Sequence, residues 1–558
     1  IQLLKTLAEL GIKGRMLSWI ISFLSNRKIQ VILEDQLSSI YAINTGVPQG
    51  SILSPILFII LLCTLPELIP VISKEFADDI VFSITADTLE DAELKMQDAI
   101  ERLLEWCNKI KLTLQPTKTK VMCFTKKADK TPRLTLEGSE IEVVQTFKYL
   151  GMTLDAPTLT WGAHINMLKS ECMARINIMR ALAGTTWGAN RECQLKIYNA
   201  MIKSKIAYGS QVLISASQSN LDKLEVVQNM ALRIATGAWN NTQISTLQCE
   251  ANMPPLDLYL QAQSIKYYYK LKNKQESHPV KEQIFNDRTI INKIWTRNIF
   301  KKPFVLKAEE IIHNWNLPMN QQIEIKSHIV PPWFHLEKYV HIEMDIPCNK
   351  SMGVDHKRQI ALNMLRTKYN NFRKIFTDGS KTEDGATGAG FYIEDRERRE
   401  CWQLEPQNSI AGAEMSAIQQ ATNWIQNQPH PDNIVILTDS QTSLHLIKQR
   451  KLKAYRNNTS KIQNNLIDLT SKGWNLHFQW IPSHIGIEGN DIADEAANLG
   501  RTEDILDTPL EDKDVNKLVD RIMHERWQLR WEIERHRSIF GLIKQKLKIG
   551  TGQEVKTG

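Results

Sequence analysis

Four acidic residues in the C-terminal part of this chain have types and positions that suit metal-ion chemistry. Asp378 ends a strand-like run that starts near residue 376, and Asp439, in Thr438-Asp439-Ser440, comes just after the apolar run 434–437. Glu414 lies on a helical stretch whose apolar residues recur at i+3, i+4, i+7 and i+11, so its carboxylate points the same way as the buried stripe. Asp494 lies on an alanine-rich helical stretch, whose small side chains permit close packing.

Several carboxylates that meet in a protein interior require compensating cations. Burying one unpaired carboxylate costs several kcal/mol, and a buried group of them would be protonated without positive charge nearby. Hard divalent cations with oxygen ligands supply that charge, which indicates Mg²⁺ or Mn²⁺. Two such ions about 3.5–4 Å apart would activate a water and stabilise the leaving oxygen at a phosphodiester.

Each acid alone also has an ordinary structural explanation. Asp378 and Asp439 could be turn or cap residues after strands. Glu414 could tip sideways into solvent, and Asp494 could be a surface acid of its helix, beside other acids. Taken together, in this order and on these elements, the four acids favour a catalytic metal site.

The segments around these acids extend the pattern. They are Phe376-Thr377-Asp378-Gly379-Ser380, Ala413-Glu414-Met415-Ser416-Ala417-Ile418, Leu437-Thr438-Asp439-Ser440, Trp480-Ile481-Pro482-Ser483-His484-Ile485-Gly486 and Gly489-Asn490-Asp491-Ile492-Ala493-Asp494. Over about residues 373–500 the chain resembles type 1 ribonuclease H in the form that retrotransposons carry. The resemblance implies a ribonuclease H-like fold that cleaves the RNA strand of RNA–DNA hybrids. It also implies that Asp378, Glu414, Asp439 and Asp494 bind the metals, and that His484 is a mobile histidine that helps proton transfer or product release.

A basic run follows the third acid. It could grip a phosphate backbone, and a solvated basic helix end explains it equally well. Some relatives carry a longer basic protrusion here, so we expect modest hybrid affinity from this domain alone. The run comprises Lys448, Arg450, Lys451, Lys453 and Arg456.

The N-terminal half carries a second set of motifs, each of which alone is a common turn. They are Gly46-Val47-Pro48-Gln49-Gly50-Ser51-Ile52-Leu53-Ser54-Pro55, Phe76-Ala77-Asp78-Asp79, Leu114-Gln115-Pro116-Thr117-Lys118-Thr119-Lys120, Phe147-Lys148-Tyr149-Leu150-Gly151, Leu154-Asp155, and Trp161 with His164. In this order they resemble the reverse transcriptases of LINE-type, non-LTR retrotransposons of the jockey-like and I-like kinds, over about residues 1–260. That resemblance implies that Asp78 and Asp79 help bind two metals for nucleotide addition. It places Gln49 and Gly50 against template and incoming nucleotide, and Lys118 or Lys120 near the site.

One feature of such polymerases has no match in this sequence. Family members use a third metal-binding aspartate on a strand upstream of the Pro-Gln-Gly loop, whereas this sequence opens after that point, at Ile1. The start therefore looks like a cut, with the fingers and the usual N-terminal endonuclease absent. A two-metal site that lacks one principal carboxylate should bind its metals poorly, so we expect this chain as given not to polymerise DNA.

The elements that must position these residues follow from periodicity. An amphipathic helix is predicted over 87–107, with Asp87 or Thr88 as its cap, and a short strand over 121–124. The apolar run 56–65 predicts a buried core helix, too short to span a bilayer. Helices dominate 159–274. A polar, proline-containing connecting region follows over 275–352, either of low order or made of small modules, and strands alternate with helices from 372. In the helical, basic tail, Trp527 and Trp531 have a spacing more typical of packing than of base stacking.

Composition narrows the class of protein. With 42% hydrophobic and 23% charged residues, the chain is ordinary globular protein. A net charge of +7 permits a nucleic-acid partner without demonstrating one. Eight scattered cysteines, with no C-x-x-C pair or Cys-His cluster, argue against zinc and disulfides and favour a reducing compartment, the nucleus or cytoplasm. No membrane partner is expected.

We therefore predict a multidomain α/β and α protein. The expected order is a partial reverse transcriptase palm (1–125), a thumb-like helical region (126–274), a connection (275–368), a ribonuclease H domain with a mixed sheet (369–502) and a helical basic tail (503–558). The expected function is hydrolysis of RNA in RNA–DNA hybrids, with retrotransposon RNA as a partner. Two alternatives are an RNA-directed DNA polymerase, if the true chain extends upstream, and an inert remnant that only binds nucleic acid.

Overall fold

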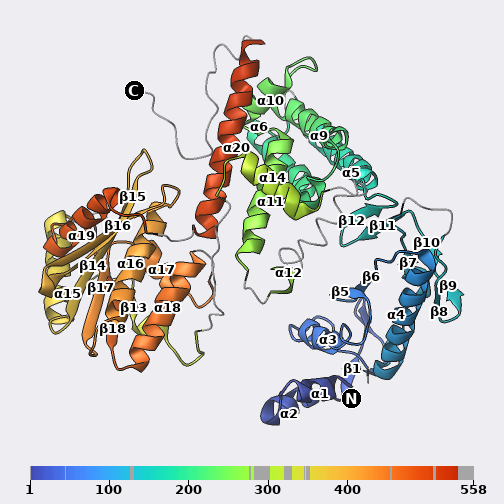
Figure 1. Cartoon of the computed structure of the whole chain (residues 1–558), viewed down its shortest axis with the longest axis horizontal. Coiled ribbons are helices and arrows are strands. Elements are labelled where there is room, and N and C mark those ends of the chain that lie inside the picture. The colour runs from blue at the N-terminus through green and yellow to red at the C-terminus, as the bar shows by residue number, and fades with distance from the viewer. Residues whose placement is uncertain are drawn as a thin grey trace. The chain divides into compact units, whose positions relative to one another are not determined.

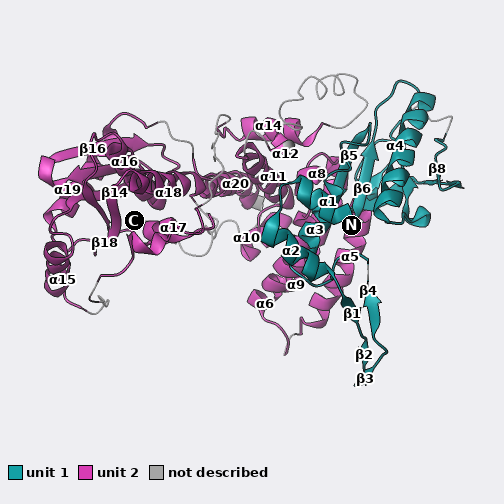
Figure 2. Cartoon of the chain, turned by 90° about the horizontal axis from the view of Figure 1, so that it is seen from below, with its two compact units in different colours: residues 1–163 teal, residues 164–558 magenta. Residues whose placement is uncertain are grey.

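The computed structural model describes residues 2–43, 45–125, 131–184, 187–274, 278–281, 302–318, 330–344, 346, 352–452, 455–506 and 510–537. The chain divides into two compact units, residues 1–163 and 164–558, which Figure 2 distinguishes by colour. Among the helices of the described residues, none is both long and apolar enough to cross a membrane.

Unit 1 combines helices with small two-stranded sheets. Its longest helix, α4 (Leu89–Ile110), confirms the amphipathic helix predicted over 87–107. The hydroxyl of Thr88 caps this helix by accepting from the backbone N–H of Asp91 at 3.1 Å. The other elements are α1 (Gln2–Glu9), α2 (Gly14–Leu24), β1 (Arg27–Ile29), β2 (Ile32–Leu33), β3 (Gln36–Leu37), β4 (Tyr41–Ile43), α3 (Ser54–Leu62), β5 (Ile72–Phe76), β6 (Asp79–Ser83), η1 (Pro116–Lys118), β7 (Lys120–Val121), β8 (Thr135–Leu136), β9 (Ser139–Glu140), β10 (Glu142–Val143), β11 (Thr146–Tyr149) and β12 (Met152–Asp155).

Two expectations for this unit were only partly right. Helix α3 exists, but it is not buried all round, since Ile56 and Ile59 are 52% and 56% exposed. Leu57 packs with α1 and α2, and Leu62 packs with α4, so neighbouring elements cover only part of its circumference. In place of the strand predicted over 121–124, the structure has the shorter β7 (Lys120–Val121), whose two residues pair with β10.

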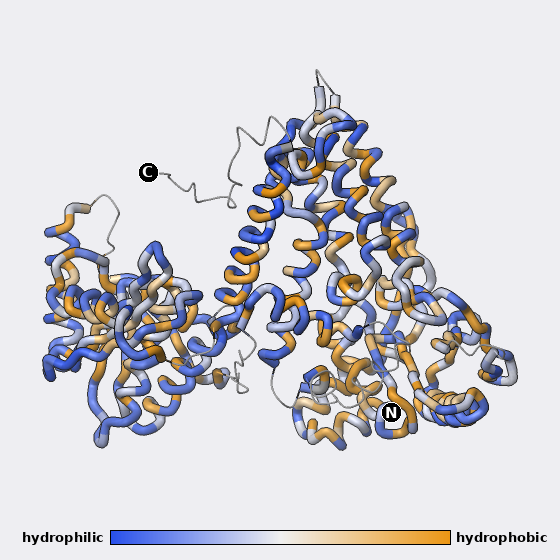
Figure 3. Tube along the Cα trace, turned by 45° about the horizontal axis from the view of Figure 1, so that its top comes forward, coloured by the Kyte–Doolittle hydropathy of each residue, from blue (hydrophilic) through white to orange (hydrophobic). Residues whose placement is uncertain are grey.

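Unit 2 begins with a helical region, which confirms the helices predicted over 159–274. Hydrophilic and hydrophobic residues are interspersed along the chain (Figure 3), and apolar residues of α10, α11 and α14 meet in one core. The helices are α5 (Gly162–Ala181), α6 (Arg191–Ile197), a π-helical turn (Tyr198–Lys203), α7 (Ser204–Ala207), α8 (Ser210–Leu213), α9 (Gln218–Thr236), α10 (Ile244–Ala251), α11 (Leu256–Lys272), α12 (Pro279–Lys281) and α14 (Phe304–Asn314).

The C-terminal helix α20 (Asp512–Glu534) is part of this helical region. Its Trp527 and Trp531 are buried in the same core as α11 and α14, so they pack, as their spacing indicated. Lys266 on α11 forms an ion pair with Asp520 at 2.6 Å. The segment expected to be a basic tail therefore completes a core whose other helices come far earlier in the chain: Lys266 and Asp520 are 254 residues apart, and Asn314 and Arg526, which share a hydrogen bond, are 212 apart.

The remaining part of unit 2, which we call the sheet domain, comprises the described residues between 330 and 506. Its six strands have the order β13-β18-β17-β14-β15-β16 (Figure 1). β14 pairs antiparallel with β15, and β15 with β16, whereas β14, β17, β18 and β13 run parallel. The strands are β13 (Val340–His341), β14 (Arg373–Lys381), β15 (Thr387–Ile393), β16 (Arg398–Leu404), β17 (Asn433–Thr438) and β18 (Asn475–Trp480).

Helices cover both faces of this mixed sheet. Ile375 and Ile436 face a core shared with α16 (Ile410–Gln426), α17 (Gln441–Lys448) and α18 (Arg456–Ser471). Their neighbours Phe376 and Leu437 face the opposite core, which includes α15 (Val354–Thr367) and α19 (Glu488–Leu499). This alternation explains why the strands read as continuous apolar runs.

The stretch expected to be a polar connection contributes to the core of the helical region and to one core of the sheet domain. Helix α14 packs with α11, and Leu336, next to β13, is buried in the sheet domain. β13 is the edge strand, with Val340 opposite Phe478 of β18. This strand has two residues, which is too short for a periodicity to predict.

Candidate active site

The site is built where the parallel pairing of β14 with β17 stops. Asp378 was expected to end its strand, but it lies within β14, which continues to Lys381 in antiparallel pairing with β15, whereas Asp439 directly follows β17. Thr377 of β14 lies opposite Thr438 of β17, so the next residues, Asp378 and Asp439, are brought side by side. Glu414 comes from α16, which crosses close above β14. A Cβ placed on Gly379 would lie 2.4 Å from the backbone nitrogen of Glu414, so only glycine permits this approach.

Asp378, Glu414 and Asp439 form a compact carboxylate cluster. One oxygen from each lies within 4.8 Å of the others, and Asp378 and Glu414 are buried. The backbone N–H of Gly379 donates to Oδ1 of Asp378 at 2.8 Å. In contrast, Oε2 of Glu414 is buried with no hydrogen-bond partner.

Electrostatics give this cluster a strong preference for added positive charge. Burial, followed by the charge of Asp439 and the neighbouring Asp494, raises the pKa of Asp378 to about 7. Burial and Asp378 raise the pKa of Glu414, and burial also raises that of Asp439. A metal ion would satisfy the partnerless oxygen of Glu414 and relieve this repulsion, so the donor set fits a hard divalent cation.

The fourth acid, Asp494, approaches the cluster from α19. This helix lies close to β15. A Cβ placed on Gly388 would be 2.2 Å from the carbonyl oxygen of Ala497, so the lack of a side chain on Gly388 permits this approach. Asp494 contributes to the raised pKa of Asp378, which indicates proximity, but it does not join the group of three. Of the four predicted acids, three are clustered, and the fourth, Asp494, lies near them with a partly exposed side chain.

Sequence reasoning missed Asn498, one helical turn after Asp494. Its Nδ2 donates to Oδ1 of Asp494 at 3.3 Å, while its Oδ1 accepts from Ser380 at 2.5 Å and from Arg501. Because a guanidinium can only donate, Arg501 determines which end of the amide faces Asp494. Its i+4 spacing from Asp494 was the one available signal.

His484 lies in the exposed loop between β18 and α19, with a left-handed φ of 51°. Its positive charge opposes the rise that burial imposes on the pKa of Asp439. The histidine is thus near the cluster, at its solvent side.

The predicted basic run does not form one free surface. Arg450 donates to the carbonyl oxygens of Pro331, Pro332 and Phe334 at 2.6–3.3 Å. Arg456 forms an ion pair with Asp512. Lys448 ends α17 and Lys451 is exposed, whereas Lys453 lies outside the described residues.

In unit 1, the predicted polymerase residues Gln49, Gly50, Asp78, Asp79 and Lys118 are exposed, and Lys120 is partly buried. Asp78 lies in the turn of the β5–β6 hairpin, and Asp79 begins β6. Gln49 and Gly50 form a turn before α3, and Lys118 ends η1. Lys120 forms an ion pair with Glu142. Within the described part of this unit, no three acids, histidines or cysteines converge on a metal position.

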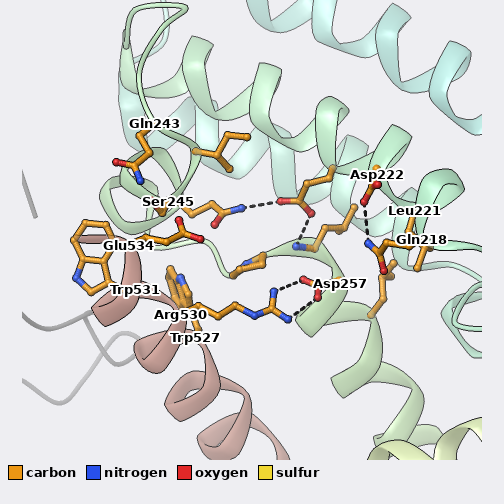
Figure 4. Close-up of a pocket in the computed structure, with 16 residues that line it drawn as sticks. Gln218, Leu221, Asp222, Gln243, Ser245, Asp257, Trp527, Arg530, Trp531 and Glu534 are labelled. Atoms are coloured by element: carbon orange, nitrogen blue, oxygen red, sulfur yellow. Dashed lines mark hydrogen bonds and ion pairs between the residues drawn. The ribbon is translucent and has the colours of Figure 1, made fainter. Parts of the chain in front are cut away.

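A cavity of about 450 Å³ lies elsewhere in unit 2, between α9, α10, α11 and α20 (Figure 4). Arg530 binds Asp257 through two hydrogen bonds of 2.9 and 2.7 Å, and Glu225 accepts from Gln248 and from the backbone N–H of Leu256. Asp222 and Glu534 also line it. Four acids against one paired arginine make this cavity unsuited to a nucleic-acid phosphate.

Comparison with known proteins assigns both parts of the chain to families. Residues 370–502 match the family described as RNase H, and residues 2–154 match the family described as reverse transcriptase (RNA-dependent DNA polymerase). The RNA-directed DNA polymerase from mobile element jockey of Drosophila funebris is 28% identical over 266 residues, which cover 46% of this chain and 28% of that protein. The probable RNA-directed DNA polymerase from transposon BS of Drosophila melanogaster is 27% identical over 261 residues, covering 45% and 29%. The match thus spans less than a third of these curated relatives.

Among solved structures, a foamy viral protease-reverse transcriptase in complex with an RNA/DNA hybrid is 13% identical and aligns over 85% of this chain and 64% of that one. The TM-score is 0.20, too low to inform the fold.

The chain therefore joins a reverse transcriptase domain to a ribonuclease H domain that carries an acidic triad. It is homologous to the reverse transcriptases of jockey-family non-LTR retrotransposons. Both resemblances seen in the sequence are confirmed at this level, as is the mixed sheet.

Proposed function

We propose that this chain hydrolyses the RNA strand of RNA–DNA hybrids, as part of a retrotransposon reverse transcriptase polyprotein. The observation that carries the proposal is the cluster of Asp378, Glu414 and Asp439, with its partnerless buried oxygen. The match of residues 370–502 to the ribonuclease H family supports the same chemistry.

In this proposal the three clustered carboxylates and Asp494 hold two divalent cations, Mg²⁺ or Mn²⁺. When bound, such ions lower the pKa of a water and stabilise the leaving oxygen. Asn498 orients Asp494, and His484 assists proton transfer or product release beside Asp439. Lys448 and Lys451 remain available for the phosphate backbone, since Arg450 and Arg456 already have partners within the chain.

The reverse transcriptase domain supplies a second candidate activity, RNA-directed DNA synthesis, with Asp78, Asp79, Gln49, Gly50 and Lys118 as its site. The family match of residues 2–154 favours it. Because Asp78 and Asp79 are exposed and no third acid joins them in the described part of unit 1, we infer weak metal binding there. Primer extension on an RNA template tests this, and robust product from this chain would contradict it.

We propose that the domains follow the predicted order of palm, thumb-like region, connection, ribonuclease H domain and tail. The packing of β13 and α20 indicates that the connection and the tail fold onto their neighbours. The partners proposed are an RNA–DNA hybrid and the RNA of the element.

The decisive experiment is cleavage of a hybrid labelled on each strand in turn, with Mg²⁺. The wild-type chain should cut the RNA strand alone, and Asp439→Asn should reduce the rate by at least 100-fold, because one of three clustered ligands loses its charge. Asp384→Asn, the same change at an exposed turn of this domain, is the matched control and should be fully active. If neither wild type nor Asp384→Asn cuts, although both bind hybrid, the chain is an inert remnant that only binds nucleic acid.

A further inference from the structure

Trp333 is 78% exposed on a segment whose neighbours are firmly packed. Val330 is buried in the core of the sheet domain, and so is Leu336. Phe334, the next residue, stacks on Tyr339 with ring centroids 5.2 Å apart and planes 11° apart. The indole is therefore presented to solvent from an ordered backbone, where it buries little apolar surface of its own.

Arg450 connects this segment to the end of α17. Its guanidinium donates to the carbonyl oxygens of Pro332 and Phe334, which flank Trp333, and to that of Pro331. The positive charge is thus held beside the backbone that carries the exposed ring.

Further basic residues are close in sequence to Arg450 and to Trp333. Lys448 and Lys451 lie two residues before and one after Arg450, and Lys338 lies five residues after Trp333. In the described segments 330–338 and 448–452, Glu337 is the one acid against four lysine and arginine side chains. An exposed aromatic ring within a basic surface has the composition of a nucleic-acid contact.

We propose that Trp333, with Lys448, Arg450 and Lys451, forms a binding site for single-stranded nucleic acid. A ring of this kind stacks on a base whose face is free, which a single strand offers and the interior of a duplex does not. The two lysines would neutralise adjacent phosphates, and Arg450, whose guanidinium is held by three carbonyl oxygens, would add positive charge beside the ring without a phosphate contact of its own.

The position of this site suits a strand that protrudes from a hybrid. Helix α17 starts just after Asp439 and ends at Lys448, so its eight residues separate the carboxylates from the basic end by about 12 Å. Three or four stacked nucleotides, at roughly 3.4 Å each, cover that length. Binding of a strand that protrudes from a hybrid at the carboxylates rests on the proposed function. Binding of a free single strand does not require cleavage.

The first test measures binding of a fluorescent 12-nucleotide pyrimidine RNA, and of the matching DNA, to the full chain in EDTA, so that cleavage cannot interfere. Trp333→Ala should weaken binding about 5- to 150-fold, the effect of losing one aromatic–base stack, and Trp333→Phe should retain most of it. Trp239→Ala removes an indole that is 83% exposed in the helical region and should change nothing. Equal affinity of Trp333→Ala and wild type would overturn the proposal.

The second test separates a single-strand site from a duplex surface. Wild type should bind a hybrid with a single-stranded overhang of six nucleotides more tightly than the blunt hybrid, and Trp333→Ala should abolish that preference. Lys448→Ala and Lys451→Ala should each reduce the slope of log affinity against log salt by about 0.7 on the single strand. If Trp333→Ala weakens blunt and overhanging hybrids alike, the surface binds duplex and the proposal is wrong. A chain that binds in this way but cuts no hybrid would refute the proposed function alone.

Discussion

At the residue scale, the carboxylate cluster couples protons to metal binding. The pKa of Asp378 is raised to about 7 because burial and two neighbouring acids disfavour its charge. A divalent cation needs the ionised form, so protons and metal compete for the same oxygens.

We therefore expect the concentration of Mg²⁺ that half-saturates hybrid cleavage to be about 10-fold higher at pH 6 than at pH 8. One proton that binds with a pKa of about 7 produces this ratio. The measurement is a Mg²⁺ titration of the initial rate at both pH values. A half-saturating concentration that is the same at both would show that Asp378 is ionised without the metal.

A second prediction at this scale concerns Asn498, which we infer to be a positioning residue. Asn498→Ala should raise the half-saturating Mg²⁺ concentration about 10-fold or more, because partners that orient metal ligands have effects of roughly 10–100-fold. Its melting temperature should stay close to that of wild type, since the residue is partly exposed. Asn433→Ala, at an exposed asparagine of the same domain, is the control. A lower rate with unchanged Mg²⁺ dependence would argue against this role.

At the scale of elements, the start of α18 depends on a residue far along the chain. The carboxylate of Glu511, next to α20, accepts from the backbone N–H groups of Asn457 and Asn458 in the first turn of α18. It therefore acts as a helix cap supplied from outside. Burial outweighs these hydrogen bonds and raises the pKa of Glu511 to about 7.

This shift predicts how stability depends on pH. Because the folded-state pKa lies above the unfolded value of about 4.5, the folded chain holds the proton more tightly, and its stability falls as pH rises from about 4.5 to 7. The contribution is at most about 3 kcal/mol. Urea unfolding at pH 5 and pH 7.5 should show a smaller loss of stability for Glu511→Gln than for wild type. Equal losses in the two chains would contradict the assignment.

At the scale of the whole molecule, α20 completes a core made by distant helices. Trp531 is fully buried with residues of α11 and α14. Trp531→Ala should therefore destabilise the chain by about 3–5 kcal/mol, the usual cost of deleting a large buried aromatic side chain. Leu529→Ala, at an exposed position of the same helix, should cost less than about 0.5 kcal/mol. Denaturant unfolding followed by circular dichroism compares the two, and similar values would show that α20 does not support this core.

The sequence by itself determined both resemblances and the three clustered acids. Asp378 lies within a strand, Asp439 just after one and Glu414 on one helix face, and local patterns are strong at such positions. The tertiary structure alone decided the rest. In the folded chain β13 pairs at the edge of the sheet, and the tryptophans of α20 are buried against distant helices. Asn498 donates to Asp494, and Arg450 donates to the backbone of the segment that carries Trp333. Each depends on which distant segments pack together, and two-residue strands, single amides and single guanidinium groups carry no periodicity that could reveal such pairings in advance.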